Sequence, residues 1–176
     1  MRRFSEGFLG YVFAVLFCLA IVGVFLLITP QSRTEHIPRV DYSMTLAQLR
    51  RTAPYEVRVP TPVPSNWVPN SSNLDPGGYT TWRLGFATAR RSHALLAQSD
   101  EPAATFASRM ANSDKVTGTR QINGTTWQER VRPDKNQRTL ISLQPGVTVV
   151  VTGQADWPEL TALAASLKPQ PRSQPS

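Results

Sequence analysis

Cysteine and histidine are nearly absent from this chain, and several kinds of chemistry are excluded with them. Cys18 is the single cysteine, so no disulfide can form within the chain. His36 and His93 have no second histidine or cysteine at zinc-ligand spacing, and we expect no metal and no cofactor. The Gly-x-Ser-x-Gly turn of serine hydrolases and a phosphate-cradling glycine loop are also missing. The sequence therefore predicts a protein that is not an enzyme.

Charged residues are missing from one long stretch, residues 7–29. A helix of this length is about 34 Å long, enough to cross a hydrocarbon core of about 30 Å. We therefore expect residues 7–29 to be a transmembrane signal anchor in contact with membrane lipid. A cleavable signal peptide is the alternative, but its apolar region would be shorter and would end in a small-x-small cleavage site. Residues 26–30 offer no such site.

The basic residues around this stretch predict an orientation. Arg2 and Arg3 precede it directly, whereas Arg33 and Arg39 follow at a greater distance. The positive-inside rule then places residues 1–6 in the cytoplasm and the rest of the chain outside the cell membrane. The opposite orientation, with the folded domain facing the cytoplasm, stays open as an alternative.

The remaining chain divides into a tether, one domain and a tail. Residues 30–40 are polar, contain two prolines and predict an extended tether. Residues 41–167 carry the periodic apolar patterns of one extracytoplasmic domain. Residues 168–176 contain three prolines and predict a disordered tail. The formal net charge is +7, but the basic residues are scattered, and we expect no nucleic-acid binding.

The first half of the domain predicts two helices and three strands. A helix is expected over 43–52, capped by Asp41 or Ser43 and ended by Pro54. Alternating residues predict strands over 55–59, 79–88 and 94–98, the last two as a hairpin. The prolines of residues 60–67 predict an extended loop that docks Trp67 on the core. A second helix is expected after residues 100–102.

The second half predicts four strands and a final helix. Strands over 116–122 and 125–131 flank an Asn-Gly turn, and strands over 138–143 and 147–152 flank a Pro-Gly turn. The valines of the last strand indicate a central position in a sheet. Asp156 caps a helix whose buried stripe ends at Leu167. The fold class is α+β, an antiparallel sheet with helices packed mainly on one face, preceded by one transmembrane helix.

Four residues form the candidate ligand or partner surface. They are Trp67, Trp82, Arg83 and Trp127. The three indoles can line a groove with the arginine at its rim, or they can build the core of a small domain, which is the commoner use of tryptophan. The sequence leaves this choice open.

Six short motifs, distributed over the domain, form a recognisable combination. They are Val40-Asp41-Tyr42, Ala53-Pro54-Tyr55-Glu56-Val57, Pro64-Ser65-Asn66-Trp67, Trp82-Arg83-Leu84-Gly85-Phe86, Gly124-Thr125-Thr126-Trp127 and Val149-Val150-Val151-Thr152-Gly153. With these motifs the chain resembles an actinobacterial family of membrane-anchored proteins, known as domain-of-unknown-function family 4245. The resemblance implies an anchored domain in a cell envelope. It implies no catalytic residue.

Three functions are compatible with these observations. We expect a non-enzymatic protein-interaction module that contacts another envelope protein. The first alternative is a binder or sensor of a small apolar or anionic ligand. The second is a hydrolase with paired carboxylates such as Asp75 and Asp134, which would have to converge in a cleft. The identity of the partner or ligand and the oligomeric state stay open.

Overall fold

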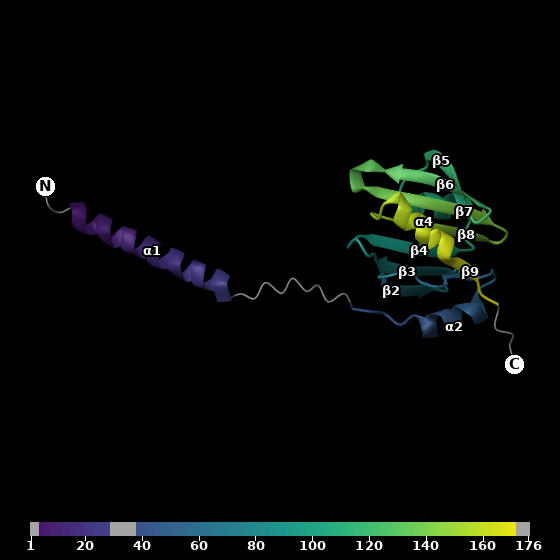
Figure 1. Cartoon of the computed structure of the whole chain (residues 1–176), viewed down its shortest axis with the longest axis horizontal. Helices are drawn as coiled ribbons and strands as arrows, with labels where there is room; N and C mark the ends of the chain where they lie inside the picture. The colour runs from purple at the N-terminus through teal and green to yellow at the C-terminus, as the bar shows by residue number, and fades with distance from the viewer. Residues whose placement is uncertain (1–3, 29–37, 172–176) are drawn as a thin grey trace. The chain divides into compact units, whose positions relative to one another are not determined.

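The computed structural model describes residues 4–28 and 38–171, which belong to two compact units (Figure 1). The first unit, Met1–His36, contains helix α1 (Phe4–Ile28), which covers most of the predicted anchor. Among the described residues, no helix combines the length and the apolar character that a membrane crossing requires. The predicted crossing stays a prediction.

The second unit, Ile37–Ser176, contains all other described elements. Its helices are α2 (Ser43–Thr52), α3 (Ala103–Ala111), the 3₁₀ turn η1 (Pro133–Lys135) and α4 (Trp157–Ser166). Its strands are β1 (Arg58–Pro60), β2 (Val68–Asp75), β3 (Thr81–Ala87), β4 (His93–Ser99), β5 (Val116–Ile122), β6 (Thr125–Arg132), β7 (Gln137–Gln144), β8 (Val147–Gly153) and β9 (Leu167–Pro169). The α+β class and the large antiparallel sheet are confirmed.

Seven strands form this sheet in the order β2-β3-β4-β8-β7-β6-β5, with every neighbouring pair antiparallel. The valine-rich β8 lies in the middle, as its composition predicted. Val149 and Val151 face a larger core, and Val150 faces a smaller one on the other side. Both cores lie wholly within the second unit, so this unit has what it needs to fold without α1.

The helices cover both faces of the sheet. Helix α4 lies across the face of the larger core (Figure 1), which Leu49 of α2 also joins. Helix α3 packs Phe106 and Met110 into the smaller core, on the opposite face. The predicted packing mainly on one face therefore holds for α2 and α4 and is wrong for α3. The physical reason is β8, whose apolar side chains point both ways and need cover on both faces.

The predicted turns are confirmed. Asn123 and Gly124 both have positive φ, as the tight turn between β5 and β6 requires, and Gly146 does the same between β7 and β8. The hairpin of β3 and β4 forms in the expected place. Asp156 caps α4 by accepting a hydrogen bond from the Glu159 amide at 2.9 Å.

Two short strands correct the predictions for the ends of the domain. The strand expected over 55–59 is reduced to β1, which pairs with β9 in a separate two-stranded sheet. Two residues of β9, Lys168 and Pro169, were expected to begin a disordered tail, and Leu167 was expected to end the last helix. The amide of Gln170 donates to Val57 O at 2.8 Å, and Arg50 Nε donates to Pro171 O at 3.0 Å. Residues 168–171 are thus part of the fold, and residues 172–176 lie outside the described residues.

Of the predicted tether, residues 30–40, only residues 38–40 belong to the described part of the chain. Its end already contacts the domain, because the Val40 amide donates to Pro69 O at 2.8 Å. Pro69 belongs to β2, a strand that the sequence did not predict. The folded unit therefore makes a hydrogen bond one residue before its predicted start at residue 41.

Candidate functional site

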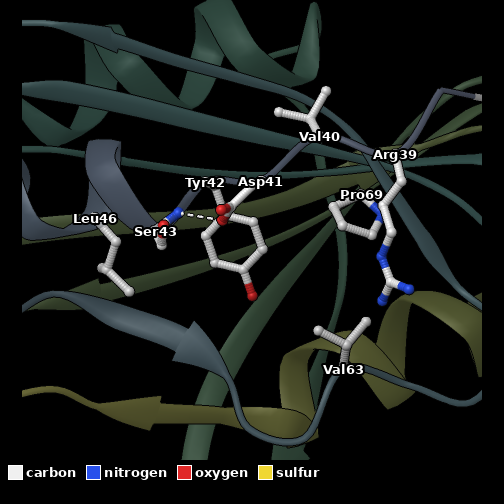
Figure 2. Close-up of a pocket in the computed structure, with 8 residues that line it drawn as sticks. All are labelled: Arg39, Val40, Asp41, Tyr42, Ser43, Leu46, Val63 and Pro69. Atoms are coloured by element: carbon white, nitrogen blue, oxygen red, sulfur yellow. Dashed lines mark hydrogen bonds between the residues drawn. The ribbon is translucent and has the colours of Figure 1, made fainter.

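A groove of about 500 Å³ lies where the chain enters the domain (Figure 2). Its walls come from the segment before α2, the first turn of α2, the loop before β2 and the start of β2. The lining residues are Arg39, Val40, Asp41, Tyr42, Ser43, Leu46, Val63 and Pro69. We call it the Tyr42 groove. Its size falls in the range of small-ligand sites.

Local hydrogen bonds hold the segment that carries the polar side chains of the groove. The Val40 amide bonds to Pro69 O, as described above. One residue further, Asp41 Oδ1 accepts from the Ser43 amide at 2.9 Å, in a turn directly before α2, whose N-cap is Tyr42 rather than the predicted Asp41 or Ser43. The Leu46 amide then donates to Tyr42 O at 2.8 Å. Arg39 and Tyr42 flank Val40 and Asp41, whose hydrogen bonds fix this short segment on the domain.

The phenol of Tyr42 combines a packed ring with an unused hydroxyl. Its ring lies against the buried ring of Trp82, with centroids 6.2 Å apart. Burial raises the pKa of the Tyr42 phenol above its ordinary value, the positive charge of Arg39 opposes this shift, and Asp41 adds to it. The hydroxyl is therefore protonated at neutral pH and can donate. Among the described residues it has no hydrogen-bond partner.

Arg39 brings a positive charge to the same groove. Figure 2 shows its guanidinium and the Tyr42 hydroxyl pointing the same way, toward Val63. Within the described part of the chain, the guanidinium makes no ion pair or hydrogen bond. Asp41 forms no ion pair with it among the described residues; its carboxylate instead accepts from the Ser43 amide, which holds the pKa of Asp41 below its usual range. The groove thus presents two free donors next to an apolar wall of Leu46, Val63 and Pro69.

A second hollow, of about 290 Å³, lies between the end of α3 and the sheet and includes His93 and Arg109. Most of its polar side chains, other than His93, are already engaged. Arg109 forms an ion pair with Glu101, and Gln137 Nε2 donates to both Met110 O and Thr152 Oγ1. Among the described residues, no three side chains of His, Cys, Asp or Glu converge as a metal site would need. The Tyr42 groove is the better candidate, because its donors are free.

The structure separates the four residues predicted as a ligand or partner surface. Trp67, Trp82 and Trp127 are 7%, 0% and 3% exposed and belong to the larger core. Trp82 lies in β3 and Trp127 in β6, with three strands between them. Arg83 is half-buried and faces away from Trp82, because neighbouring residues of a strand point to opposite faces. None of the four lines the Tyr42 groove.

The sequence contained a signal for the groove that was interpreted differently. Asp41 was interpreted as a helix cap, and Tyr42 as part of the Val40-Asp41-Tyr42 motif of the resemblance. Arg39 was considered only for membrane orientation. The signal that could have pointed to a site is an arginine two residues before, and a tyrosine directly after, the aspartate that precedes the helix. The groove also needs Val63 and Pro69, whose proximity depends on the tertiary fold.

Together these features define an α+β domain with a groove where the chain enters it. The chain belongs to the family described as "Protein of unknown function (DUF4245)", whose profile matches residues 3–167. This confirms the family expected from the sequence. A comparison with curated proteins gives no match. The family match covers the groove as well as the sheet, and its description states no activity.

Proposed function

We propose that this chain is a non-enzymatic binding module whose Tyr42 groove takes a small ligand with one anionic group and an apolar body. One observation carries the proposal: Arg39 and the Tyr42 hydroxyl, both without partners among the described residues, lie beside the apolar Leu46, Val63 and Pro69. A carboxylate or phosphate would accept hydrogen bonds from both donors. Its apolar part would cover the wall of the groove and remove that surface from water.

We further propose that the chain is a single-pass cell-membrane protein, with residues 7–29 as the anchor and the domain on the outer side. The support comes from the uncharged sequence of this stretch and from α1, whose apolar side chains between Val12 and Val24 are exposed around the helix. Such a location, in the envelope of an actinobacterium as the resemblance implies, would bring the groove close to lipid and envelope ligands.

The binding proposal is tested with residues 38–176 and a dansyl-labelled fatty acid, compared with the corresponding uncharged alcohol. The acid should bind at least tenfold more tightly, because only the carboxylate can pair with Arg39. Arg39→Met should remove this difference. Arg51→Met is the matched control, since Arg51 is exposed on α2 and does not line the groove. Equal affinity for acid and alcohol in the wild-type unit would reject the proposal.

A protein partner in the envelope is the second candidate function. It is favoured by β5, an edge strand whose outer side pairs with no described strand and whose first residue, Val116, is 45% exposed. An extended segment of a partner can add to such an edge. The test is in-cell cross-linking of the full chain, followed by purification and mass spectrometry. A chain with Val116→Lys and Thr117→Pro should lose a partner that docks on β5, and retention of that partner would reject this site.

A further inference from the structure

The fold gathers a series of chain connections at one end of the seven-stranded sheet. These are the connections from β3 to β4, from α3 to β5, from β6 to β7 and from β8 to α4. Together with up to two flanking strand residues on each side, they span residues 88–92, 112–115, 132–138 and 153–156. The register places them side by side through the pairs Ala87–His93, Ala94–Gly153, Arg138–Gly153, Arg132–Gln137 and Val116–Arg130. They form one surface, although they are distant in sequence.

This surface is strongly basic. With these flanking strand residues, which include Arg132 of β6 and Arg138 of β7, the four segments contain six basic and three acidic residues. Two of the acids are paired, Asp134 with Arg132 and Asp156 with Arg90. We call the surface the basic end and define it by Arg90, Arg91, Lys115, Lys135 and Arg138. All but Arg138 are exposed, and within the described residues Arg91, Lys115, Lys135 and Arg138 form no ion pair.

The opposite end of the sheet has the reverse character. Its connections and their flanking strand residues, in residues 75–81, 99–102, 122–125 and 144–147, contain three acidic residues and no basic one. The acids are Asp75, Asp100 and Glu101, of which Glu101 is paired with Arg109 of α3. The sheet is therefore polarised along its strands, with a net positive charge at one end and a net negative charge at the other. A negatively charged surface would orient the domain with the basic end toward it.

The chain enters the domain near this same end. Val40 is hydrogen-bonded to Pro69, and the neighbouring Val68 pairs with Ala87, the residue before the connection of residues 88–92. Nine residues, 30–38, separate the proposed anchor from Arg39, and a chain of nine residues spans at most about 30 Å. An anchor ending at residue 29 would thus hold the basic end within reach of the membrane surface.

We propose that the basic end docks on anionic lipid headgroups and holds the domain against the membrane, with the acidic end pointing away. This inference rests on the proposed anchor for its location, but the charge pattern on which it depends belongs to the folded unit alone. Each lysine or arginine near an anionic bilayer strengthens binding about fivefold at physiological salt. Docking would also place the Tyr42 groove near the lipid surface.

The test uses residues 38–176 and sedimentation with lipid vesicles, so that the anchor makes no contribution. The unit should bind vesicles containing phosphatidylglycerol, should bind pure phosphatidylcholine vesicles at least tenfold more weakly, and should be released by 0.5 M salt. The variant Lys115→Glu/Lys135→Glu should lose at least tenfold in affinity for the anionic vesicles. Both side chains are exposed, and thermal unfolding of the variant checks that the fold is kept.

The matched control is Arg51→Glu/Lys168→Glu, which changes the net charge equally at two exposed positions on α2 and β9, outside the basic end. It should retain most of the vesicle binding. An equal loss in both variants would show that total charge alone matters and would overturn the proposal, as would absence of binding to anionic vesicles. Neither variant touches a groove residue, so fatty-acid affinity, measured in parallel, reports separately on the binding proposal.

Discussion

The side-chain amide of Gln98 pairs with the backbone of Arg58 as a neighbouring strand would. Gln98 Oε1 accepts from the Arg58 amide at 2.8 Å, and Gln98 Nε2 donates to Arg58 O at 2.6 Å. Gln98 is fully buried in β4 of the large sheet, whereas Arg58 begins β1 of the small one. One glutamine therefore joins the two sheets and satisfies both backbone groups of a residue that has no strand neighbour on that side.

Replacing this glutamine should destabilise the domain strongly. Gln98→Leu keeps a similar volume but leaves the amide and carbonyl of Arg58 without partners, at a cost of about 2–4 kcal/mol in the free energy of unfolding. Urea denaturation of residues 38–176 measures this loss. Gln121→Leu is the control, because Gln121 is exposed and bonds only to Thr126 on the neighbouring strand. A loss for Gln98→Leu no larger than the control would contradict the pairing.

Gly153 should tolerate no side chain. Its φ of 156° lies in the range that favours glycine, and a Cβ there would be 2.1 Å from the carbonyl oxygen of His93. That oxygen is fixed, since it accepts from the amides of both Gln154 and Ala155. Gly153→Ala should therefore cost about 3 kcal/mol or more, from backbone strain and overpacking combined. The measurement is again the free energy of unfolding in urea.

Gly146→Ala provides the comparison for this prediction. Gly146 also has positive φ, 73°, but a Cβ there would meet nothing within 4 Å. Its replacement should cost only the conformational penalty, about 1 kcal/mol. Equal losses at Gly146 and Gly153 would show that the strand ends of β4 and β8 move apart easily to admit a methyl group.

The sequence predicted the elements whose signals are local. The capped start of α4 at Asp156 and the Asn123-Gly124 turn depend on a few neighbouring residues, and both were found in place. Strand β2 was missed because its sequence, with Asn70, Ser71 and Ser72 in the middle, is typical of a loop. It forms a strand because its backbone completes the edge of β3. Tertiary pairing overrides local propensity there.

The candidate site could not be predicted for a related reason. Large aromatic side chains are used for ligands and for cores alike, and only burial shows that Trp67, Trp82 and Trp127 serve the core. The Tyr42 groove forms because the residues before α2 lie close to Val63 and Pro69. Both of these are more than twenty residues further along the chain. The strand β9 likewise depends on β1, more than a hundred residues earlier. Short-range sequence patterns contain no information on these long-range tertiary contacts.

Asp41 should give α2 a stability that depends on pH. Its bond with the Ser43 amide holds the pKa of the folded-state carboxyl below the ordinary 3.8. A lowered folded-state pKa means that the stabilisation is fully present above pH 3.8 and is lost as the pH falls through the lower, folded value. Asp41→Ala should therefore lower the melting temperature of residues 38–176 at pH 7, and the difference from wild type should shrink toward pH 2.

Asp114→Ala controls for the removal of one exposed negative charge, because Asp114 lies in the connection before β5 and starts no helix. Its melting temperature should follow that of the wild-type unit at both pH values. A difference between Asp41→Ala and wild type that persists unchanged at pH 2 would show that the carboxylate charge is not the source of the stabilisation.

Tyr42→Phe should separate ligand binding from stability. The Tyr42 ring packs on Trp82 and would still do so as phenylalanine, while its hydroxyl has no hydrogen-bond partner among the described residues. The free energy of unfolding should therefore change by less than about 0.5 kcal/mol. The affinity for the dansyl-labelled fatty acid should fall up to about tenfold, because the carboxylate loses one donor. Fluorescence titration and urea denaturation of the same preparation measure both quantities.

Tyr79→Phe is the matched control, since Tyr79 is an exposed tyrosine outside the groove. It should change neither the stability nor the affinity. Combined with Arg39→Met, Tyr42→Phe should lower the affinity by less than the product of the two single effects, because both donors bind the same carboxylate. Unchanged affinity in Tyr42→Phe would place the carboxylate away from the hydroxyl. A large loss of stability would instead mean that the hydroxyl serves the fold, and either result would remove Tyr42 from the binding site.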